Sequence, residues 1–139
     1  MNDAIHSDDA PPPVGRYPHA RRVGNLLFLS GIGPRQAGTD EIPGVTLNSA
    51  GEVIATDIEA QCRSVFENVR RVLESAGSSW DRLVDVTVYL THMAEDFETY
   101  NRVYAEFFRD HPPCRTTVGI SSLPTPIAIE LKCIATVDD

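Results

Sequence analysis

Two stretches of this sequence repeat their apolar residues every three or four positions, and segments of alternating polarity stand before, between and after them. The first stretch follows Thr56, which forms a capping box with Glu59, the side-chain pair that begins many helices. Gly77 suits the end of the same helix, because glycine readily takes the left-handed backbone of a C-terminal cap. The apolar residues at helical spacing are Ile58, Cys62, Val65, Phe66, Val69, Val72, Leu73 and Ala76. The pattern predicts an amphipathic helix between residues 56 and 77.

A second amphipathic helix is predicted over residues 94–109, because Pro112 and Pro113 cannot continue it. The aromatic residues of its apolar side are interpreted as core. Between the two helices, four apolar residues alternate with polar neighbours, as in a half-buried strand: Val84, Val86, Val88 and Leu90.

Further strands are predicted at both ends of the chain. Segments 17–22 and 26–30 flank Gly24-Asn25 and indicate a hairpin. Segments 115–120 and 127–137 supply the last two strands. This order predicts an α+β protein in which both helices cover one face of a mixed sheet.

The length of 139 residues fits a single domain. Residues 1–13 are polar and acidic and end in three prolines, so we expect a flexible N-terminal tail followed by one domain over residues 14–139. Residues 32–55 contain many glycines and prolines. They predict a long loop, with a brief strand near residues 52–54, and loops of this length are often functional.

Charge and composition exclude several classes of protein. The net charge of −8 is a poor match for nucleic acid or anionic lipid, so neither is expected as a partner. No apolar run approaches the ~20 residues of a membrane span, and the N-terminus lacks the order of a signal peptide, so we expect a cytoplasmic protein. Three cysteines without a CxxC spacing predict neither a metal site nor a disulfide framework.

The sheet face away from the helices carries residues too apolar for full exposure, such as Thr87, Ala128 and Ile134, and self-association would cover them. Two charged residues stand in apolar strands. Arg115 begins a strand of small and β-branched residues, and Glu130 lies in the last strand, where an unpaired carboxylate is costly. A structural salt bridge from Glu130 to Lys132 and a functional role remain equally open.

Four segments in this order resemble the RidA/YjgF/YER057c/UK114 family. They are residues 15–19 (GRYPH), 28–31 (FLSG), 100–108 (YNRVYAEFF), and 115–118 (RTTV) continuing through 123–124 to 129–135 (IELKCIA). Each segment is weakly specific alone, and the resemblance extends over residues 14–137.

The resemblance implies a chorismate-mutase-like fold and a homotrimer with its sites in clefts between subunits; a dimer of trimers is also possible. It implies hydrolysis of 2-enamine or 2-imine acids to 2-oxo acids and ammonia, with no metal or organic cofactor. Arg115 would bind the carboxylate of a small substrate, and Glu130 would activate the attacking water. Asn101 would face the pocket, and Ser30 and Gly31 would border it.

Where this sequence differs from the general, housekeeping imine deaminases of the family, it resembles the 2-aminomuconate deaminase branch. The loop after Gly31 is longer, Thr117 stands in the substrate pocket where cysteine is common, and Tyr17, a pocket-wall aromatic, is followed by a different segment. That branch converts 2-aminomuconate to 4-oxalocrotonate, the keto form of 2-hydroxymuconate, in aromatic or tryptophan catabolism. Its substrate has two carboxylates, so a second cation is expected: Arg35 first, His19 second.

Alternatives remain for these residues and for the function. Arg35 could be an exposed loop residue, while His19 could be a hydrogen-bonded structural histidine or the proton donor to the leaving ammonia. The protein could instead be a general 2-imino acid deaminase acting on 2-aminoacrylate, or a non-catalytic sensor of 2-oxo acids. RNA cleavage, ascribed to some eukaryotic relatives, fits poorly with the acidic charge.

Overall fold

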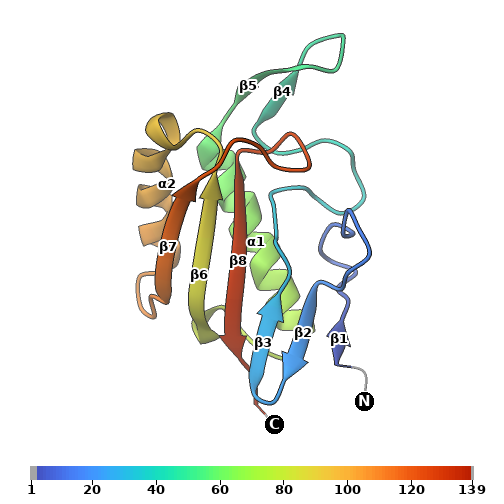
Figure 1. The fold of residues 1–139 in the computed structure, drawn as a ribbon, viewed down its shortest axis with the longest axis vertical. Helices are drawn as coiled ribbons and strands as arrows, with labels where there is room; N and C mark the ends of the chain where they lie inside the picture. The colour runs from blue at the N-terminus through green and yellow to red at the C-terminus, as the bar shows by residue number, and fades with distance from the viewer. Residues whose placement is uncertain (1–2, 139) are drawn as a thin grey trace.

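A computed structural model describes residues 3–138, which form a six-stranded sheet with two helices packed behind it (Figure 1). The strand order in the sheet is β1-β2-β3-β8-β6-β7. Its members are β1 (Ala4–Ile5), β2 (Ala20–Val23), β3 (Leu26–Leu29), β6 (Leu83–Leu90), β7 (Cys114–Gly119) and β8 (Ile129–Thr136). The helices are α1 (Ile58–Ser75) and α2 (Met93–Phe107), and a short 3-10 turn, η1 (Trp80–Arg82), precedes β6.

Neighbouring strands pair antiparallel except β6 and β7, which are parallel and joined through α2. The core lies between the sheet and the helices. Residues of α1 that face it are fully buried, among them Cys62, Val65, Phe66 and Val69. The opposite face of the sheet carries no helix (Figure 1). The predicted arrangement, with both helices on one face of a mixed sheet, is therefore observed.

Helix α1 begins one residue later than the capping box predicts. Asp57 is the N-cap, and its carboxylate accepts hydrogen bonds from the backbone N–H groups of Glu59 and Ala60, at 3.0 and 3.3 Å. An aspartate at this position also places negative charge at the positive end of the helix dipole. Gly77 ends the helix as predicted, with φ of +81°.

The prediction that Val84 points into the core from the start of β6 is wrong. The register between β6 and β8 shifts between Leu83 and Asp85, so the strand carries a bulge there. Leu83 is buried and Val84 is 41% exposed, although alternation from Val86 and Val88 places Val84 inside. A bulge changes which face a side chain points to, and the apolar pattern alone does not reveal it.

The long segment 32–55 is more ordered than the sequence predicts. It contains a hairpin of β4 (Val45–Leu47) and β5 (Val53–Thr56), which projects from the end of the sheet (Figure 1). The brief strand expected near residues 52–54 corresponds to β5, whereas β4 was not predicted. Leu47, Val53 and Ile54 are exposed on this arm.

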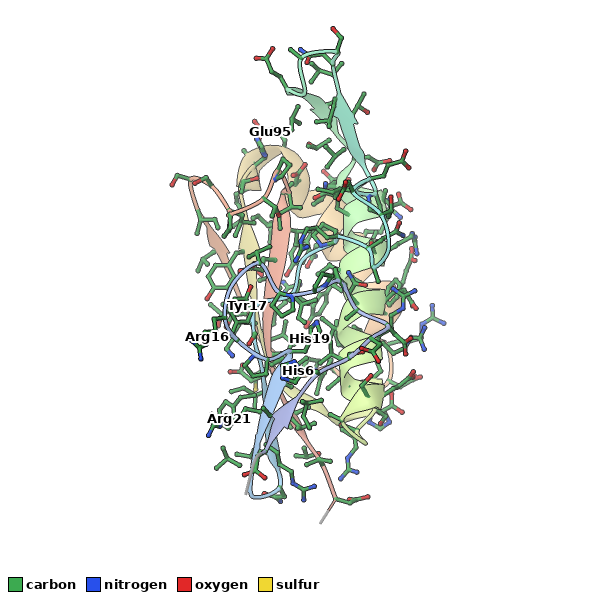
Figure 2. The ribbon with its side chains drawn as sticks, turned by 90° about the vertical axis from the view of Figure 1, so that its right-hand side faces the viewer. His6, Arg16, Tyr17, His19, Arg21 and Glu95 are labelled. Atoms are coloured by element: carbon green, nitrogen blue, oxygen red, sulfur yellow. The ribbon has the colours of Figure 1, made fainter. Side chains whose placement is uncertain are left out.

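The N-terminal segment differs from the expected flexible tail, because residues 4–13 lie against the domain. Strand β1 pairs with β2, and Ser7 and Ala10 are buried. His19 accepts a hydrogen bond at Nδ1 from the Ser7 backbone N–H (2.9 Å), and its Nε2 lies 2.8 Å from the Pro11 carbonyl oxygen. Figure 2 shows His19 next to His6 of this segment. Residues 1, 2 and 139 lie outside the described part.

We predict that His19→Leu lowers the free energy of unfolding by roughly 2–4 kcal/mol, because it leaves a buried N–H and a buried carbonyl without partners. Urea unfolding followed by circular dichroism measures the loss. His6→Leu is the matched control, since His6 is exposed, and it should change stability by less than about 0.5 kcal/mol. Equal losses in the two variants would show that His19 does not hold the N-terminal segment.

Candidate active site

Glu130 projects from β8 onto the face of the sheet that no helix covers. Its neighbours Ile129 and Leu131 point into the core and are fully buried, while Glu130 is half-buried opposite Tyr89 of β6. Within residues 3–138 its carboxylate has no hydrogen bond or ion pair. The salt bridge to Lys132 is not formed, because the Lys132 ammonium donates to the Leu29 carbonyl. Burial raises the pKa of Glu130 above its ordinary value.

Gly31 allows this carboxylate to lie against the backbone. A Cβ added at Gly31 would stand 2.8 Å from Glu130 Oε2, so a side chain at this position would displace the end of the Glu130 side chain. The chain is held there because Ile32 pairs with Leu131, next to Glu130 in β8. Gly31 was expected to border the substrate pocket, and within one protomer it lies against the carboxylate of Glu130.

Tyr17 and Ser30 complete the surroundings of Gly31. The three residues line one narrow cavity of about 30 Å³. The Ser30 hydroxyl donates to the Pro18 carbonyl at 2.7 Å, which fixes the chain segment that carries Tyr17. Tyr17 is 40% exposed. We call Tyr17, Ser30, Gly31 and Glu130 the acid half-site.

Arg115 stands at the start of β7, the edge strand of the sheet. The parallel register places Arg115 opposite Val86, so its side chain lies on the face covered by α2. Its Nη1 donates to Asn101 Oδ1 at 2.9 Å, and its guanidinium carbon lies 4.7 Å from the Tyr104 ring centroid. No carboxylate of residues 3–138 pairs with it. Arg115 is thus a cation held in place by neutral groups and left without a counter-ion.

Thr117 lies two residues further along β7 on the same face as Arg115, and its hydroxyl is 2.8 Å from the hydroxyl of Tyr100. We call Asn101, Arg115 and Thr117 the arginine half-site.

The two half-sites do not meet in one protomer. Glu130 faces away from the helices and Arg115 faces α2, and β6 separates their strands. Alternation fixes this, because successive side chains of a strand point to opposite faces. The predicted residues therefore form two groups, and only another copy of the chain could bring an arginine half-site to an acid half-site.

His19 and Arg35, the two candidates for a second cation, differ in their surroundings. Both ring nitrogens of His19 form hydrogen bonds with backbone groups. This agrees with the alternative of a hydrogen-bonded structural histidine and leaves no free ring N–H to protonate the leaving ammonia. Arg35 is half-buried and donates to the Pro12 carbonyl at 2.8 Å. It lines the narrow cavity of the acid half-site and also a larger cavity of about 630 Å³. Across residues 3–138 no carboxylate forms an ion pair with Arg35, although Asp40 and Glu41 line the larger cavity.

Two tyrosines were missed as site residues. The helical pattern of residues 94–109 assigned Tyr100 and Tyr104 to the core, and both are buried, but their rings also lie under the guanidinium of Arg115. Apolar periodicity reports which side of a helix is covered and does not report what covers it. In the described residues, no group of three or more His, Cys, Asp or Glu side chains could hold a metal ion. No described helix is long and apolar enough to cross a membrane.

The class of protein is therefore a small α+β domain whose candidate site contains an arginine and a half-buried glutamate, neither of which forms an ion pair within residues 3–138. The family model described as "Endoribonuclease L-PSP" matches residues 7–137. The RutC family protein PH0854 of Pyrococcus horikoshii is 39% identical over 135 residues, which cover 97% of this chain and 98% of that protein. Reactive Intermediate Deaminase A of Arabidopsis thaliana chloroplasts is 31% identical over 134 residues, or 96% of this chain and 65% of that protein.

Among solved structures, E. coli TdcF with bound serine superposes with a TM-score of 0.82 at 31% identity, covering 97% of this chain and 98% of that chain. The chain therefore belongs to the RidA/YjgF/L-PSP family, which includes the RutC proteins. The expected chorismate-mutase-like α+β fold is confirmed.

The raised pKa of Glu130 predicts how stability depends on pH. The folded chain holds the Glu130 proton more tightly than the unfolded chain does, so the free energy of unfolding falls as pH rises from about the ordinary pKa of 4.5 through the raised value. Glu130→Gln has no such titration. The free energy of unfolding of Glu130→Gln, minus that of the wild type, should rise between about pH 4.5 and the raised pKa of Glu130 and stay constant at higher pH.

Urea unfolding between pH 4 and pH 8, at one protein concentration, measures this difference. Glu98→Gln removes an exposed carboxylate and should give a difference that hardly changes with pH. If the Glu130→Gln difference is equally flat, the carboxylate is not destabilised by burial.

Proposed function

We propose that this protein is a deaminase that hydrolyses a 2-enamine or 2-imine carboxylate to the 2-oxo acid and ammonia, in sites shared between the subunits of a homotrimer. The observation that carries the proposal is the pair of half-sites: an arginine without a counter-ion on one face and a half-buried glutamate without a partner on the other. The name of the Arabidopsis relative and the serine bound to E. coli TdcF, which bears a carboxylate, support a substrate of this kind.

The chemistry follows from the two charged groups. Arg115 donates two N–H groups to the substrate carboxylate, a planar pairing that fixes the adjacent C2 carbon. In the imine tautomer C2 is already electrophilic, so the site has only to place a water molecule. Glu130 accepts a proton from that water, and its raised pKa makes it a stronger base than an exposed glutamate. As the C2–O bond forms, the π electrons of C2=N move to nitrogen, which takes a proton, and a carbinolamine results. Its amino group then takes the proton that Glu130 accepted, the C–N bond breaks to release ammonia, and the hydroxyl gives up its proton as the C=O bond of the 2-oxo acid forms.

The distribution of charge supports a head-to-tail assembly. Residues 10–39 contain four arginines, one histidine and no aspartate or glutamate, in a chain of net charge −8. Arg16, Tyr17 and Arg21 point to the side of the molecule away from α1 (Figure 2). This basic segment, which includes β2 and β3 near one edge of the sheet, and the acidic remainder of the chain favour contact between unlike surfaces of two copies, and such contacts close into rings. The half-exposed Phe28, Tyr89 and Ile134 would be covered in the same contact.

Ammonia release from freshly generated imine substrates tests this proposal. We expect wild type to accelerate release, Arg115→Ala to lower kcat/KM at least about a hundredfold through the lost carboxylate contact, and Glu130→Gln to lower kcat by roughly 10²–10⁴-fold. Trimers co-expressed from equal amounts of the two variants should recover activity at about one site in four, because random assembly places an intact arginine half-site against an intact acid half-site that often.

Recovery in the mixture cannot occur if each site lies within one protomer, so an inactive mixture with intact trimers would refute the shared site. Arg109→Gln, a change at an exposed arginine outside both half-sites, is the control for expression and assembly. A wild type that binds 2-oxo acids without accelerating ammonia release would identify a sensor instead.

Within this reaction class we propose 2-aminomuconate as the substrate and 4-oxalocrotonate as the product. The substrate has a carboxylate at each end, and one arginine cannot hold both. Arg35 supports this choice, because it carries no ion pair within residues 3–138 and lines both the narrow cavity of the acid half-site and the larger cavity. The competing substrate, 2-aminoacrylate, has one carboxylate and does not need Arg35.

Arg35→Gln should raise KM for 2-aminomuconate about tenfold or more, since a charge-assisted hydrogen bond contributes ~1.5–3 kcal/mol, and should leave 2-aminoacrylate turnover within about twofold. Both substrates are generated in coupled enzyme systems and followed by ammonia release, with Arg109→Gln again as the matched control. Equal effects on the two substrates, or a wild type that prefers 2-aminoacrylate, would remove the dicarboxylate assignment and leave a general imine deaminase.

A further inference from the structure

The guanidinium of Arg115 is held from three directions by neutral groups. Asn101 accepts from Nη1 at 2.9 Å, and the rings of Tyr104 and Tyr100 lie beneath the guanidinium carbon, with centroids at 4.7 and 5.3 Å. Stacking on an aromatic face attracts the cation and restricts the plane in which its N–H groups point. A side chain that exposes its charge is thereby fixed before any ligand arrives.

The two tyrosines beneath Arg115 are alike in their rings and different in their hydroxyls. Tyr104 is buried, and its hydroxyl has no hydrogen-bond partner among the described residues. Tyr100 is fully buried, and its hydroxyl lies 2.8 Å from Thr117 Oγ1. Packing alone accounts for Tyr104, whereas the hydroxyl of Tyr100 connects α2 to the half-buried side chain next to Arg115 on the same face of β7.

The direction of this hydrogen bond, in which either hydroxyl can be the donor, determines where the hydrogen of the Thr117 hydroxyl points. Burial raises the pKa of Tyr100, so its phenol keeps its proton and can donate. When Tyr100 donates to Thr117 Oγ1, the hydrogen of Thr117 is left to donate elsewhere. A hydroxyl has one hydrogen and accepts at its oxygen, so an inward bond from Tyr100 directs the Thr117 donor outward. Residues i and i+2 of a strand are about 6.6 Å apart, which places that donor beside the guanidinium of Arg115.

We propose that Tyr100 is a positioning residue for binding of the carboxylate substrate: its ring fixes the guanidinium plane of Arg115, and its hydroxyl turns Thr117 into a further donor to the same ligand. The ligand class is a 2-oxo or 2-imino carboxylate, in which a second acceptor atom lies next to the carboxylate. This inference rests on the proposed function for its substrate, and its binding test is independent of turnover.

Tyr100→Phe and Tyr104→Phe form a matched pair, because each removes one buried hydroxyl and keeps the ring. Calorimetric titration with pyruvate, the simplest 2-oxo acid, measures Kd, and ammonia release measures KM and kcat. We expect Tyr100→Phe to raise Kd and KM about three- to tenfold with kcat within twofold. Tyr104→Phe should change the three constants less than Tyr100→Phe does, because the Tyr104 hydroxyl has no hydrogen-bond partner among the described residues. Equal constants for the two variants would overturn the role of the Tyr100 hydroxyl.

The variant Thr117→Val tests whether Tyr100 acts through Thr117. If Tyr100 acts through Thr117, the double variant Tyr100→Phe/Thr117→Val should bind pyruvate no more weakly than Thr117→Val alone. Losses that add would mean that the Tyr100 hydroxyl acts by another route and would overturn the inference. A purely structural role would lower the melting temperature of Tyr100→Phe without changing Kd. If the wild type binds pyruvate but deaminates no imine, the proposed function fails while the Kd comparison still decides the role of Tyr100.

Discussion

The strict alternation of β8 governs the arrangement of the whole site. This strand lies inside the sheet, between β3 and β6, and its alternate residues Ile129, Leu131, Cys133 and Ala135 are fully buried against the helices. With that face committed to the core, Glu130 can only point to the uncovered face. A one-residue slip would reverse every side chain of the strand, so the core and the position of the carboxylate are fixed by the same register. The parallel pairing of β6 and β7 then puts Arg115 on the helix side. The separation of acid and arginine is a consequence of how the core is made.

Periodicity predicted the elements that bury a continuous side and failed where local geometry departs from it. Helix α1, helix α2 and the inward face of β8 were predictable because their apolar residues repeat. Val84 was misplaced since a bulge adds one residue to β6. The segment before residue 14 was predicted as a tail because it is polar and rich in proline. Its order depends on His19, whose two ring nitrogens match a backbone donor and a backbone acceptor more than seven residues away in the chain. Pairing of this kind is not visible in composition.

The residues of the candidate site were likewise predicted only in part from the sequence. The cost of a glutamate in an apolar strand singled out Glu130, and the family resemblance assigned a role to Arg115. That a side chain at Gly31 would displace the Glu130 carboxylate follows only from their 2.8 Å approach, a contact between residues far apart in the sequence. Tyr100 and Tyr104 were taken as core because a buried aromatic looks the same in a sequence whether it contacts leucine or a guanidinium. Side-chain orientation at the edge of a sheet was the missing information.

Three arginines on the two helices form ion pairs with glutamates, whereas the two arginines of the candidate site form none within residues 3–138. On the helices, Arg63, Arg70 and Arg102 each pair with glutamates on their own helix or the neighbouring one. Arg115 and Arg35 have only neutral hydrogen-bond partners within residues 3–138, an amide oxygen and a backbone carbonyl. Arg71 likewise has only a neutral hydrogen-bond partner within residues 3–138, the amide oxygen of Asn68, so the position of Arg115 and Arg35 in the candidate site, and not the missing ion pair alone, marks them as candidates to bind an external anion. Their electrostatic attraction is weak while they face water and strengthens when another surface excludes it. In the proposed trimer the uncovered sheet face of one copy would lie over Arg115 of another, and the exclusion of water there would raise the affinity of this arginine for a carboxylate.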